Sequence, residues 1–406
     1  MSRTVTLVEF NPSGGLFQFA VQLGEALAER GDQVELLTGP EPELVSRHPG
    51  FRITPCLPTW HANAGAGDRV VTRRVRRLAR AARYHLAWAV VLRRLRRARP
   101  DVVQFSGLRF PVDGLVLAWL ARRSTGRPVL AMVAHAPAPF NEQRATGAIF
   151  KRNALLDRSL GLGYRSVDAV MVLGEQTAAD LRARWPEVGD ISVVPHGDEA
   201  VFLRGAPTPA DTTGPVVLFF GTMQAYKGLD LLMEAWGQVR VQRPDARLVI
   251  AGSPSGDTDL DGLRRTAEQS GGVDLRAGYV PLDQVAGIFD AARVVVAPYR
   301  YANASGVVEL AGTAARPVVA TAVGDLPAVV RDEVTGIIVP PGDATALAGA
   351  LVRLLDRPEE ARRMGEAAQA RSAQEASWGR VAEEVGRAYE RGSAARSAAA
   401  RGGATP

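Results

Sequence analysis

Short apolar runs alternate with helical patterns along almost all of this 406-residue chain. That alternation is typical of parallel sheets whose two faces are covered by helices. Helical patterns such as Leu16–Arg30 and Leu229–Val241 fill the gaps between the runs. We therefore predict an α/β fold of two doubly wound sheets with six strands each. The strands expected in the first half are Val5–Val8, Gln33–Leu37, Asp101–Phe105, Pro128–Val133, Ala169–Leu173 and Ile191–Val194, and those in the second half are Val216–Phe220, Arg247–Ala251, Val273–Ala277, Val294–Ala297, Val318–Thr321 and Ile337–Val339.

The length and one change of composition indicate two domains. A chain of 406 residues is long enough for two domains of about 150–200 residues each. Proline, threonine and glycine concentrate at Arg204–Pro215, where we place the linker. We expect a first Rossmann-like domain at 1–203, a second at 204–373, a final helix at 374–391 and a disordered tail at 392–406. The ligand site is expected in a cleft between the domains, facing the carboxyl ends of the strands.

Composition excludes several classes of protein. Hydrophobic residues make up 46% of the chain and charged residues 23%, which is typical of globular proteins. No window reaches the roughly 18–20 consecutive apolar residues of a spanning helix, and the amino terminus enters a strand directly. The single cysteine, Cys56, excludes an internal disulfide and a thiolate metal cluster. We therefore expect a cytoplasmic protein without a signal segment.

The basic residues are almost all arginines. Of the 49 lysines and arginines only Lys151 and Lys227 are lysines, and the formal net charge is +6. We interpret the imbalance as the coding bias of a GC-rich genome, which weakens any argument from arginine abundance. A lysine that persists against such a bias indicates a site that needs a compact point charge.

The segment Val294–Pro327 predicts an anion site. It contains an apolar strand, a turn of small residues and then a helix that starts near Ser305. At such a start the backbone N–H groups of Ser305, Gly306 and Val307 point outward, and the helix dipole adds partial positive charge. One turn further, Glu309 can accept hydrogen bonds from ligand hydroxyls. Phosphates beside such a carboxylate indicate a nucleotide with its ribose.

A second loop supplies a cation. The stretch Gly221–Gly228 follows an apolar strand and precedes a helix. Lys227 stands at the start of that helix, where a cation opposes the helix dipole. A role in capping or in solubility is the plainer alternative. The unfavourable placement of the charge nevertheless favours a bound anion.

These two segments resemble the donor-binding region of retaining glycosyltransferases of family 4, which have the two-domain GT-B architecture. The signature of that family is a pair of glutamates separated by seven residues. Glu309 matches the second glutamate, which binds the ribose of the donor in the family, whereas Tyr301 stands in place of the first. The resemblance spans about residues 3–390. It implies that the first domain lies on the acceptor side, that the second domain binds the nucleotide-sugar donor, and that the final helix crosses back to the first domain.

The same resemblance implies roles for the loop after the expected strand Val216–Phe220. In the family an arginine and a lysine of this loop grip the diphosphate of the donor. Lys227 matches the lysine, while Thr222, directly after Gly221, replaces the arginine. We expect Arg300 to compensate for the missing charge.

The first half of the chain resembles the family as well. The segment Asn11–Gly31 carries Gly14 and Gly15 after the first strand, and in the family this glycine loop approaches the donor phosphates. The family often places a histidine against the donor sugar at the position of His135. A histidine that only satisfies a loop backbone is the alternative. For His196, which precedes the linker, we expect a role in lining the hinge.

An acidic motif at Asp257, Asp259 and Asp261 is similar to the metal site of the other nucleotide-sugar transferase architecture. It lies in a turn rich in serine and glycine ahead of the expected helix Leu260–Gln269, where aspartates cap helix starts. We therefore interpret the motif as capping. Because GT-B enzymes generally need no divalent ion, we predict neither a metal nor a cofactor beyond the nucleotide-sugar co-substrate.

A basic segment precedes Pro100. Residues 68–100 contain 12 arginines interleaved with apolar residues, Tyr84 and Trp88. An amphipathic basic helix of this kind can lie on an anionic membrane, here the inner face. A solvated helix inflated by the arginine bias is the alternative. Nucleic-acid binding is not expected, because no binding module accompanies the arginines.

Together with the family resemblance, these patterns predict a cytoplasmic hexosyltransferase that moves a sugar from a nucleoside diphosphate sugar to a hydroxyl acceptor. The resemblance further implies that the transfer retains the anomeric configuration and needs no metal. The acceptor class stays open between a lipid-linked, a polysaccharide and a small-molecule acceptor. The candidate catalytic residues are His135 and Lys227. The donor-binding set comprises Gly14, Gly15, Gly221, Thr222, Lys227, Arg300, Ser305, Gly306, Val307 and Glu309.

Three alternatives belong to other classes. A catalytically degenerate transferase that serves as a partner or regulator is suggested by Tyr301 and Thr222. A nicotinamide-dependent oxidoreductase would require a G-x-G-x-x-G loop, whose spacing Asn11–Phe17 lacks. A pyridoxal-phosphate phosphorylase would need a Schiff-base lysine, for which only Lys151 and Lys227 are available.

Overall fold

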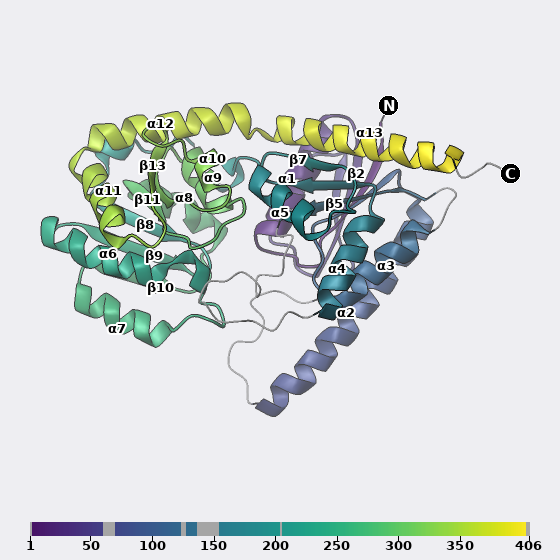
Figure 1. Ribbon diagram of the computed structural model, residues 1–406, viewed down its shortest axis with the longest axis horizontal. Coiled ribbons are helices and arrows are strands. Elements are labelled where there is room, and N and C mark those ends of the chain that lie inside the picture. Colours follow the sequence, from purple (N-terminus) through teal and green to yellow (C-terminus); the bar gives the residue numbers. More distant parts are fainter. Residues whose placement is uncertain (1, 60–69, 123–126, 136–153, 204, 403–406) are drawn as a thin grey trace. The chain divides into compact units, whose positions relative to one another are not determined.

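All strand pairs of the described chain are parallel, as the alternation of strands and helices predicts. The computed structural model describes residues 2–59, 70–122, 127–135, 154–203 and 205–402 (Figure 1). These residues form two compact units, one built from residues before 196 together with those from 378 onward, and the other from 196–377. The division at Pro195 and His196 precedes the predicted boundary at residue 203. Each unit holds one sheet covered by helices, which confirms the predicted fold class.

The first sheet has seven strands in the order β3-β2-β1-β4-β5-β6-β7, one more than predicted. The additional strand, β3, lies at the edge of the sheet, and only Phe51 of its five residues is buried. It therefore lacks the apolar run by which buried strands are found in a sequence. The strands are β1 (Thr4–Val8), β2 (Gln33–Thr38), β3 (Phe51–Pro55), β4 (Val102–Phe105), β5 (Val129–Ala134), β6 (Ala169–Val172) and β7 (Ile191–Val193).

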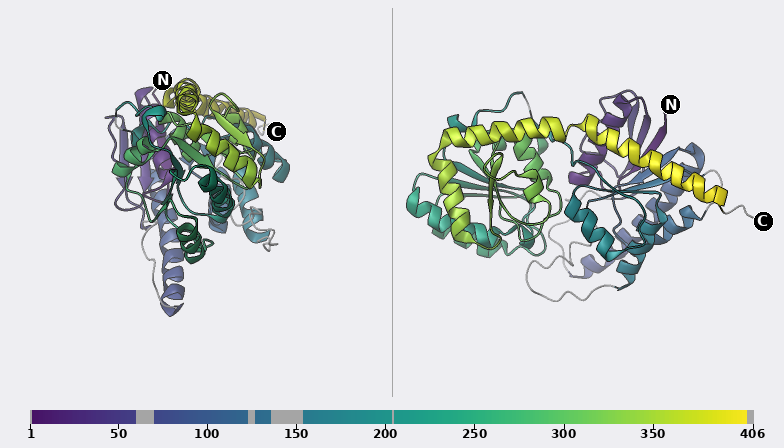
Figure 2. Two further views of the ribbon diagram at one scale, coloured as in Figure 1. Left: turned by 90° about the vertical axis from the view of Figure 1, so that its left-hand side faces the viewer. Right: turned by 45° about the horizontal axis from the view of Figure 1, so that its top comes forward.

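The helices of the first unit bury apolar side chains against this sheet. They are α1 (Gly15–Glu29), α2 (Val70–Ala98), α3 (Pro111–Ala121), α4 (Ala154–Ser166), α5 (Glu175–Arg184) and α13 (Trp378–Gly402). In α1, Phe17, Leu23 and Leu27 are fully buried. Figures 1 and 2 show α13 running along the first unit as the last helix of the chain.

The predicted disorder of the tail is wrong for residues 392–402, because α13 continues to Gly402. The alanine-rich sequence beyond residue 391 favours a helix. Two arginines also tie this helix to the first unit, since Arg391 Nε donates to Asp190 Oδ2 over 2.8 Å and Arg396 donates to the carbonyl oxygen of Arg127. At the other end of the helix, Trp378 lies edge-on to Phe19 of α1. Residues 403–406 of the predicted tail lie outside the described residues.

The second sheet has the six predicted strands, in the order β10-β9-β8-β11-β12-β13. They are β8 (Val216–Phe220), β9 (Arg247–Gly252), β10 (Val273–Ala277), β11 (Val294–Ala297), β12 (Val318–Thr321) and β13 (Gly336–Val339). Its helices are α6 (Leu229–Gln242), α7 (Leu260–Ser270), α8 (Leu282–Ala291), α9 (Gly306–Thr313), α10 (Leu326–Val329), α11 (Ala344–Asp356) and α12 (Pro358–Glu375). Short 3-10 helices are η2 (Ala200–Phe202), η3 (Ala210–Thr212) and η4 (Ala225–Lys227). From the central pair β8 and β11 the chain proceeds toward opposite edges, which makes this pair the topological switch point.

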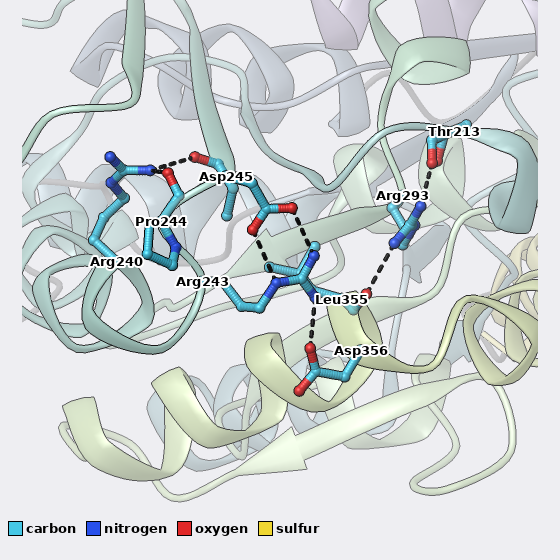
Figure 3. A network of polar contacts seen from close by, with 9 residues as sticks. Thr213, Arg240, Arg243, Pro244, Asp245, Arg293, Leu355 and Asp356 are labelled. Atoms are coloured by element: carbon cyan, nitrogen blue, oxygen red, sulfur yellow. Dashed lines mark hydrogen bonds and ion pairs between the residues drawn. The ribbon is translucent and has the colours of Figure 1, made fainter.

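Arginines hold together the amino-terminal edge of this second sheet (Figure 3). Arg243 lies before β9, and buried Arg293 lies before β11. Their acceptors are the carboxylates of Asp245 and Asp356 and the carbonyl oxygens of Leu355 and Thr213. Because ligands bind at the opposite, carboxyl-terminal edge of such sheets, we assign this network a structural role.

Two glycines allow neighbouring backbone segments to pack closely against the turn that follows β11. Gly228 (φ +68°) and Gly324 (φ +54°) both have backbone conformations that L side chains rarely adopt. A Cβ at Gly228 would lie 2.0 Å from the carbonyl oxygen of Pro298, and one at Gly324 would lie 1.6 Å from that of Ala302. The backbones after β8, β11 and β12 are therefore in direct contact.

Replacing Gly228 with alanine should destabilise the second unit, because the added methyl group meets the Pro298 oxygen and the backbone is strained. We expect the free energy of unfolding to fall by about 2 kcal/mol or more. Gly237→Ala is the matched control, since Gly237 is exposed within α6 and a Cβ there meets no atom within 4 Å. That change should raise stability by up to about 1 kcal/mol. Urea denaturation followed by fluorescence measures the free energy of unfolding of both variants. Equal values would contradict the predicted clash between a Cβ at Gly228 and the Pro298 oxygen.

Candidate functional site

Two loops emerge together at the switch point of the second sheet. One follows β8 and runs from Gly221 to Lys227, and the other follows β11 and runs from Pro298 to Ser305. Because β8 and β11 pair directly in parallel, both loops lie at the same carboxyl-terminal edge. Open α/β sheets bind their ligands at this place.

Lys227, Gly221 and Val307 converge where these loops meet. Lys227 ends η4 and is only 7% exposed. A Cβ on Gly221 would lie 2.9 Å from Lys227 Nζ and 3.3 Å from Cγ2 of Val307, which belongs to the first turn of α9. The bare backbone of Gly221, at φ +104°, therefore leaves the ammonium group room beside the start of α9. These three residues of the predicted donor site lie together.

Lys227 is a buried cation without a carboxylate partner. Burial lowers the pKa of its ammonium group from 10.5 to about 8. Its Nζ lies 5.5 Å from the centroid of the Tyr299 ring. Across the described residues, no carboxylate oxygen lies within 4.0 Å of this nitrogen. An uncompensated buried charge is costly, so the position favours a bound anion.

The start of α9 offers backbone N–H groups to the same anion. The carbonyl oxygen of Ser305 accepts hydrogen bonds from the N–H groups of Val308 and Glu309, at 3.0 and 3.1 Å. Within the described chain, the N–H groups of Ser305, Gly306 and Val307 have no acceptor. Free N–H groups at the positive end of a helix dipole suit the oxygens of a phosphate.

Two side chains beside Gly306 are not part of the predicted site. A Cβ on Gly306 would lie 3.1 Å from Cε1 of His196 and 3.4 Å from Oε1 of Glu199. Burial lowers the pKa of His196 to about 4, so its ring is neutral at pH 7. The position of His196 before the linker predicts a hinge residue, whereas no pattern in the sequence marks Glu199. Gly306 thus provides the space in which these two side chains approach α9.

Glu309 is held by an arginine that sequence reasoning missed. Its side chain is almost fully buried, and its Oε2 accepts from Nη2 of Arg371 in α12 over 2.5 Å. Burial raises the pKa of Glu309, and the charge of Arg371 works in the opposite direction. The other carboxylate oxygen, Oε1, has no hydrogen-bond partner in the part of the chain that the structure describes. Glu309 can therefore accept one further hydrogen bond, from a ligand.

Thr222 and Arg300 do not join the group around Lys227. Thr222 is exposed, and its hydroxyl donates to Gln224 at 3.5 Å. Arg300 forms two hydrogen bonds with the carboxylate of Asp230 in α6, at 3.2 and 2.6 Å. A phosphate contact through Arg300 would have to replace this ion pair, and its role as the compensating cation stays a prediction.

The predicted residues of the first unit follow β1 and β5 of the first sheet. Gly14 precedes α1 with φ +85°, and its N–H donates to Oε2 of Glu43 over 3.1 Å. Gly15 begins the helix, and a Cβ there would meet no atom within 4 Å. His135 directly follows β5, and its ring stands edge-on to Phe19 of α1 at 4.8 Å. The roles of Gly14, Gly15 and His135 stay predictions.

Of the acidic motif, Asp259 caps α7 as predicted, whereas Asp257 binds the start of another helix and Asp261 pairs with Arg264. Asp259 Oδ1 accepts from the N–H of Gly262 over 2.9 Å at the start of α7. Asp257 Oδ2 accepts from the N–H of Ala225 over 3.1 Å, which fixes the start of the 3-10 helix that carries Lys227. Among the described residues no three His, Cys, Asp or Glu side chains are grouped so that they could hold a metal ion. Metal independence itself stays a prediction.

Two glycosyltransferase family models together match most residues of both units. Residues 13–198 match the model described as Glycosyltransferase Family 4, and residues 214–357 match Glycosyl transferases group 1. The chain is 34% identical over 208 residues to the D-inositol 3-phosphate glycosyltransferase of Mycolicibacterium paratuberculosis, covering 50% of this chain and 45% of that protein. It is 28% identical over 412 residues to the protein of that name from Streptomyces griseus subsp. griseus, covering 93% and 84%.

Solved structures share the fold. Sucrose-phosphate synthase from Thermosynechococcus elongatus superposes with a TM-score of 0.75 at 24% identity, covering 97% of this chain and all of that chain. HepE from Anabaena, solved with UDP and glucose, gives a TM-score of 0.65 at 14% identity, covering 96% and 99%. At these identities the likeness shows a common two-domain GT-B architecture.

Affinity for a nucleoside diphosphate should fall as the pH rises through about 8. The pKa of Lys227 is lowered to about 8 in the free protein, and only its charged form attracts the diphosphate. Binding then takes up a proton, so affinity should weaken up to tenfold per pH unit above that value. Calorimetry with UDP from pH 7 to 9.5 measures this slope. Lys227→Arg, which stays charged, should flatten it, and a flat profile in the unmodified protein would contradict the role of Lys227.

Proposed function

Because the chain belongs to glycosyltransferase family 4, we propose that it transfers a sugar from a nucleoside diphosphate sugar to a hydroxyl group of an acceptor. The observation that carries this proposal is the buried Lys227 ammonium group beside Gly221 and the free N–H groups of α9. An anion with several oxygens fits one cation and a row of N–H donors. A diphosphate is such an anion.

Transfer breaks the bond between the anomeric carbon and the diphosphate, so negative charge develops on the departing phosphate. Lys227 and the N–H groups of Ser305–Val307 stabilise that charge from fixed positions. Glu309 accepts a ribose hydroxyl through its free Oε1, while Arg371 holds Oε2 in place. In this arrangement Lys227 supplies the charge for which other transferases use a metal ion.

The proposed reaction retains the anomeric configuration. The acceptor oxygen forms a bond to the anomeric carbon on the face that the diphosphate leaves, and the acceptor proton passes to a departing phosphate oxygen. This course follows the family resemblance and requires no carboxylate nucleophile. His135, at the end of β5, contacts the donor sugar in this scheme.

A uridine diphosphate sugar is the donor that we propose to test first. The structure of HepE, which shares the fold, contains UDP and glucose. Relatives of this chain are named for D-inositol 3-phosphate, which is a cyclic polyol with a phosphate group. A small polyol is therefore the proposed acceptor class. A degenerate transferase without turnover is the second candidate, favoured by Thr222 and Tyr301 in place of the charged residues of the family.

Thermal-shift measurements with UDP, GDP, ADP and dTDP test the donor site. At a hundred times its Kd the preferred nucleotide should stabilise the protein by about 2.7 kcal/mol, a rise in Tm of roughly 2–4 °C. Lys227→Ala should lose most of that rise, whereas Arg265→Ala, which removes an exposed cation of α7, should keep it. Release of nucleoside diphosphate from the matching sugar donor then shows turnover. No release from any donor of a broad panel would favour the degenerate transferase.

We further propose that α2 contacts an anionic membrane. Its described side chains include exposed Leu78 and Leu86, with exposed Arg83 between them. Apolar and cationic groups on one exposed stretch suit the surface of an anionic bilayer. None of the described helices combines the length and the apolar character that membrane crossing requires.

Sedimentation with liposomes tests this contact. Vesicles that contain anionic lipid should bind the protein at low salt and release it as the salt concentration rises, because the attraction is electrostatic. Leu78→Ser together with Leu86→Ser should reduce binding, because apolar contact is lost. Equal binding to neutral and anionic vesicles would contradict the proposal.

A further inference from the structure

The switch point of the first sheet carries an ion pair that the donor chemistry does not use. Strands β1 and β4 are parallel neighbours at the centre of that sheet. Glu9 directly follows β1, and Arg109 lies in the loop after β4. Arg109 Nη2 donates to Glu9 Oε1 over 2.5 Å. The pair therefore occupies the place at which open α/β sheets bind ligands.

The Glu9 side chain is buried and held in place, whereas part of the Arg109 side chain is exposed to solvent. The Glu9 side chain is 2% exposed, and its Oε1 also accepts from the N–H of Asn11 over 2.8 Å. The Arg109 side chain is 25% exposed. As far as the structure describes the chain, Arg109 Nε and Nη1 and Glu9 Oε2 have no hydrogen-bond partners. The pair can therefore offer a ligand two donors, Nε and Nη1 of Arg109, and one acceptor, Oε2 of Glu9.

A different carboxylate holds the loop in place. Asp113 Oδ2 accepts from the backbone N–H groups of Arg109 and Phe110, at 2.7 and 2.8 Å. Asp113 Oδ1 accepts from Tyr84 and Trp88 of α2. The loop is thus ordered without the guanidinium group of Arg109. Because buried ion pairs add little net stability, a structural role alone does not explain the pair with Glu9.

We propose that Glu9, Arg109 and Phe110 form the acceptor subsite, and that it takes a neutral ring with adjacent hydroxyl groups. The inference rests on the proposed function and narrows its acceptor class, a small polyol, to neutral rings. A carboxylate beside a guanidinium group offers an acceptor and a donor side by side, which matches two neighbouring hydroxyls. Phe110 is 45% exposed, and its ring packs against Tyr84, so it presents an aromatic surface to ring C–H groups.

The charge balance favours a neutral acceptor over a phosphorylated one. Glu9 neutralises Arg109, and Asp113 adds a second carboxylate nearby. Burial alone would lower the pKa of Arg109, but the charges of Glu9, Tyr84 and Asp113 raise it. A phosphate at Arg109 would meet the Glu9 carboxylate and be repelled. Hydroxyl groups meet no such penalty.

Acceptor kinetics with a saturating donor test the subsite. The panel consists of inositol and glucose, each with and without a phosphate group, and the variants are Glu9→Gln and Phe110→Ala. Both variants should raise the KM for the neutral acceptor about tenfold or more. The thermal shift with nucleotide and the donor hydrolysis without acceptor should stay unchanged. Glu29→Gln, which alters an exposed carboxylate at the end of α1, should change neither.

The outcomes separate the two proposals. An unchanged acceptor KM in both variants, a KM at least tenfold lower for a phosphorylated acceptor, or refusal of both neutral acceptors overturns the subsite, while nucleotide binding and donor hydrolysis persist. If the unmodified protein neither binds a nucleotide nor hydrolyses a donor, the proposed function fails and the subsite fails with it. Phe110→Ala alters an exposed side chain, so its result does not depend on the folding of the Glu9 variant.

Discussion

The candidate site depends on one uncompensated charge, the buried ammonium group of Lys227. The residues around Lys227 hold its side chain in place but do not neutralise its charge. Gly221 leaves space beside Nζ, Asp257 fixes the start of the 3-10 helix that ends at Lys227, and Gly228 allows the backbone to pass against Pro298. The cost of burying the charge is offset only when an anion arrives. We propose that nucleotide binding and leaving-group stabilisation depend on that arrangement, and metal independence stays a prediction.

Much of the fold could be predicted from the sequence because burial leaves a clear pattern. The central strands of both sheets are buried along most or all of their length, and their apolar runs are plain in the sequence. The edge strand β3 has no such run, since only Phe51 is buried. The sequence does not predict the last turns of α13, for a different reason. Its small, alanine-rich composition is shared by disordered tails and helices, and only the contacts of Arg391 and Arg396 decide between them.

The residues of the candidate site also fall into two kinds: those that the sequence predicts and those that only the tertiary structure brings together. Lys227, Gly221 and the start of α9 could be identified because each belongs to a local strand–loop–helix pattern. Arg371 could not, because its contact with Glu309 joins residues 62 positions apart and is set by the packing of α12. Glu9 and Arg109 are likewise brought together by the pairing of β1 with β4, which only the sheet order reveals. Local motifs thus locate a site, while its charge balance comes from tertiary contacts.

The chain has only two lysines, so a direct titration of the decisive group is feasible. NMR of protein labelled at the lysine side chains would give one signal from Lys151 and one from Lys227, and Lys227→Arg would assign them. Our account predicts a pKa of about 8 for Lys227 in the free protein and a clear rise when UDP is added. A pKa near 10.5 that does not respond to any nucleoside diphosphate would contradict it.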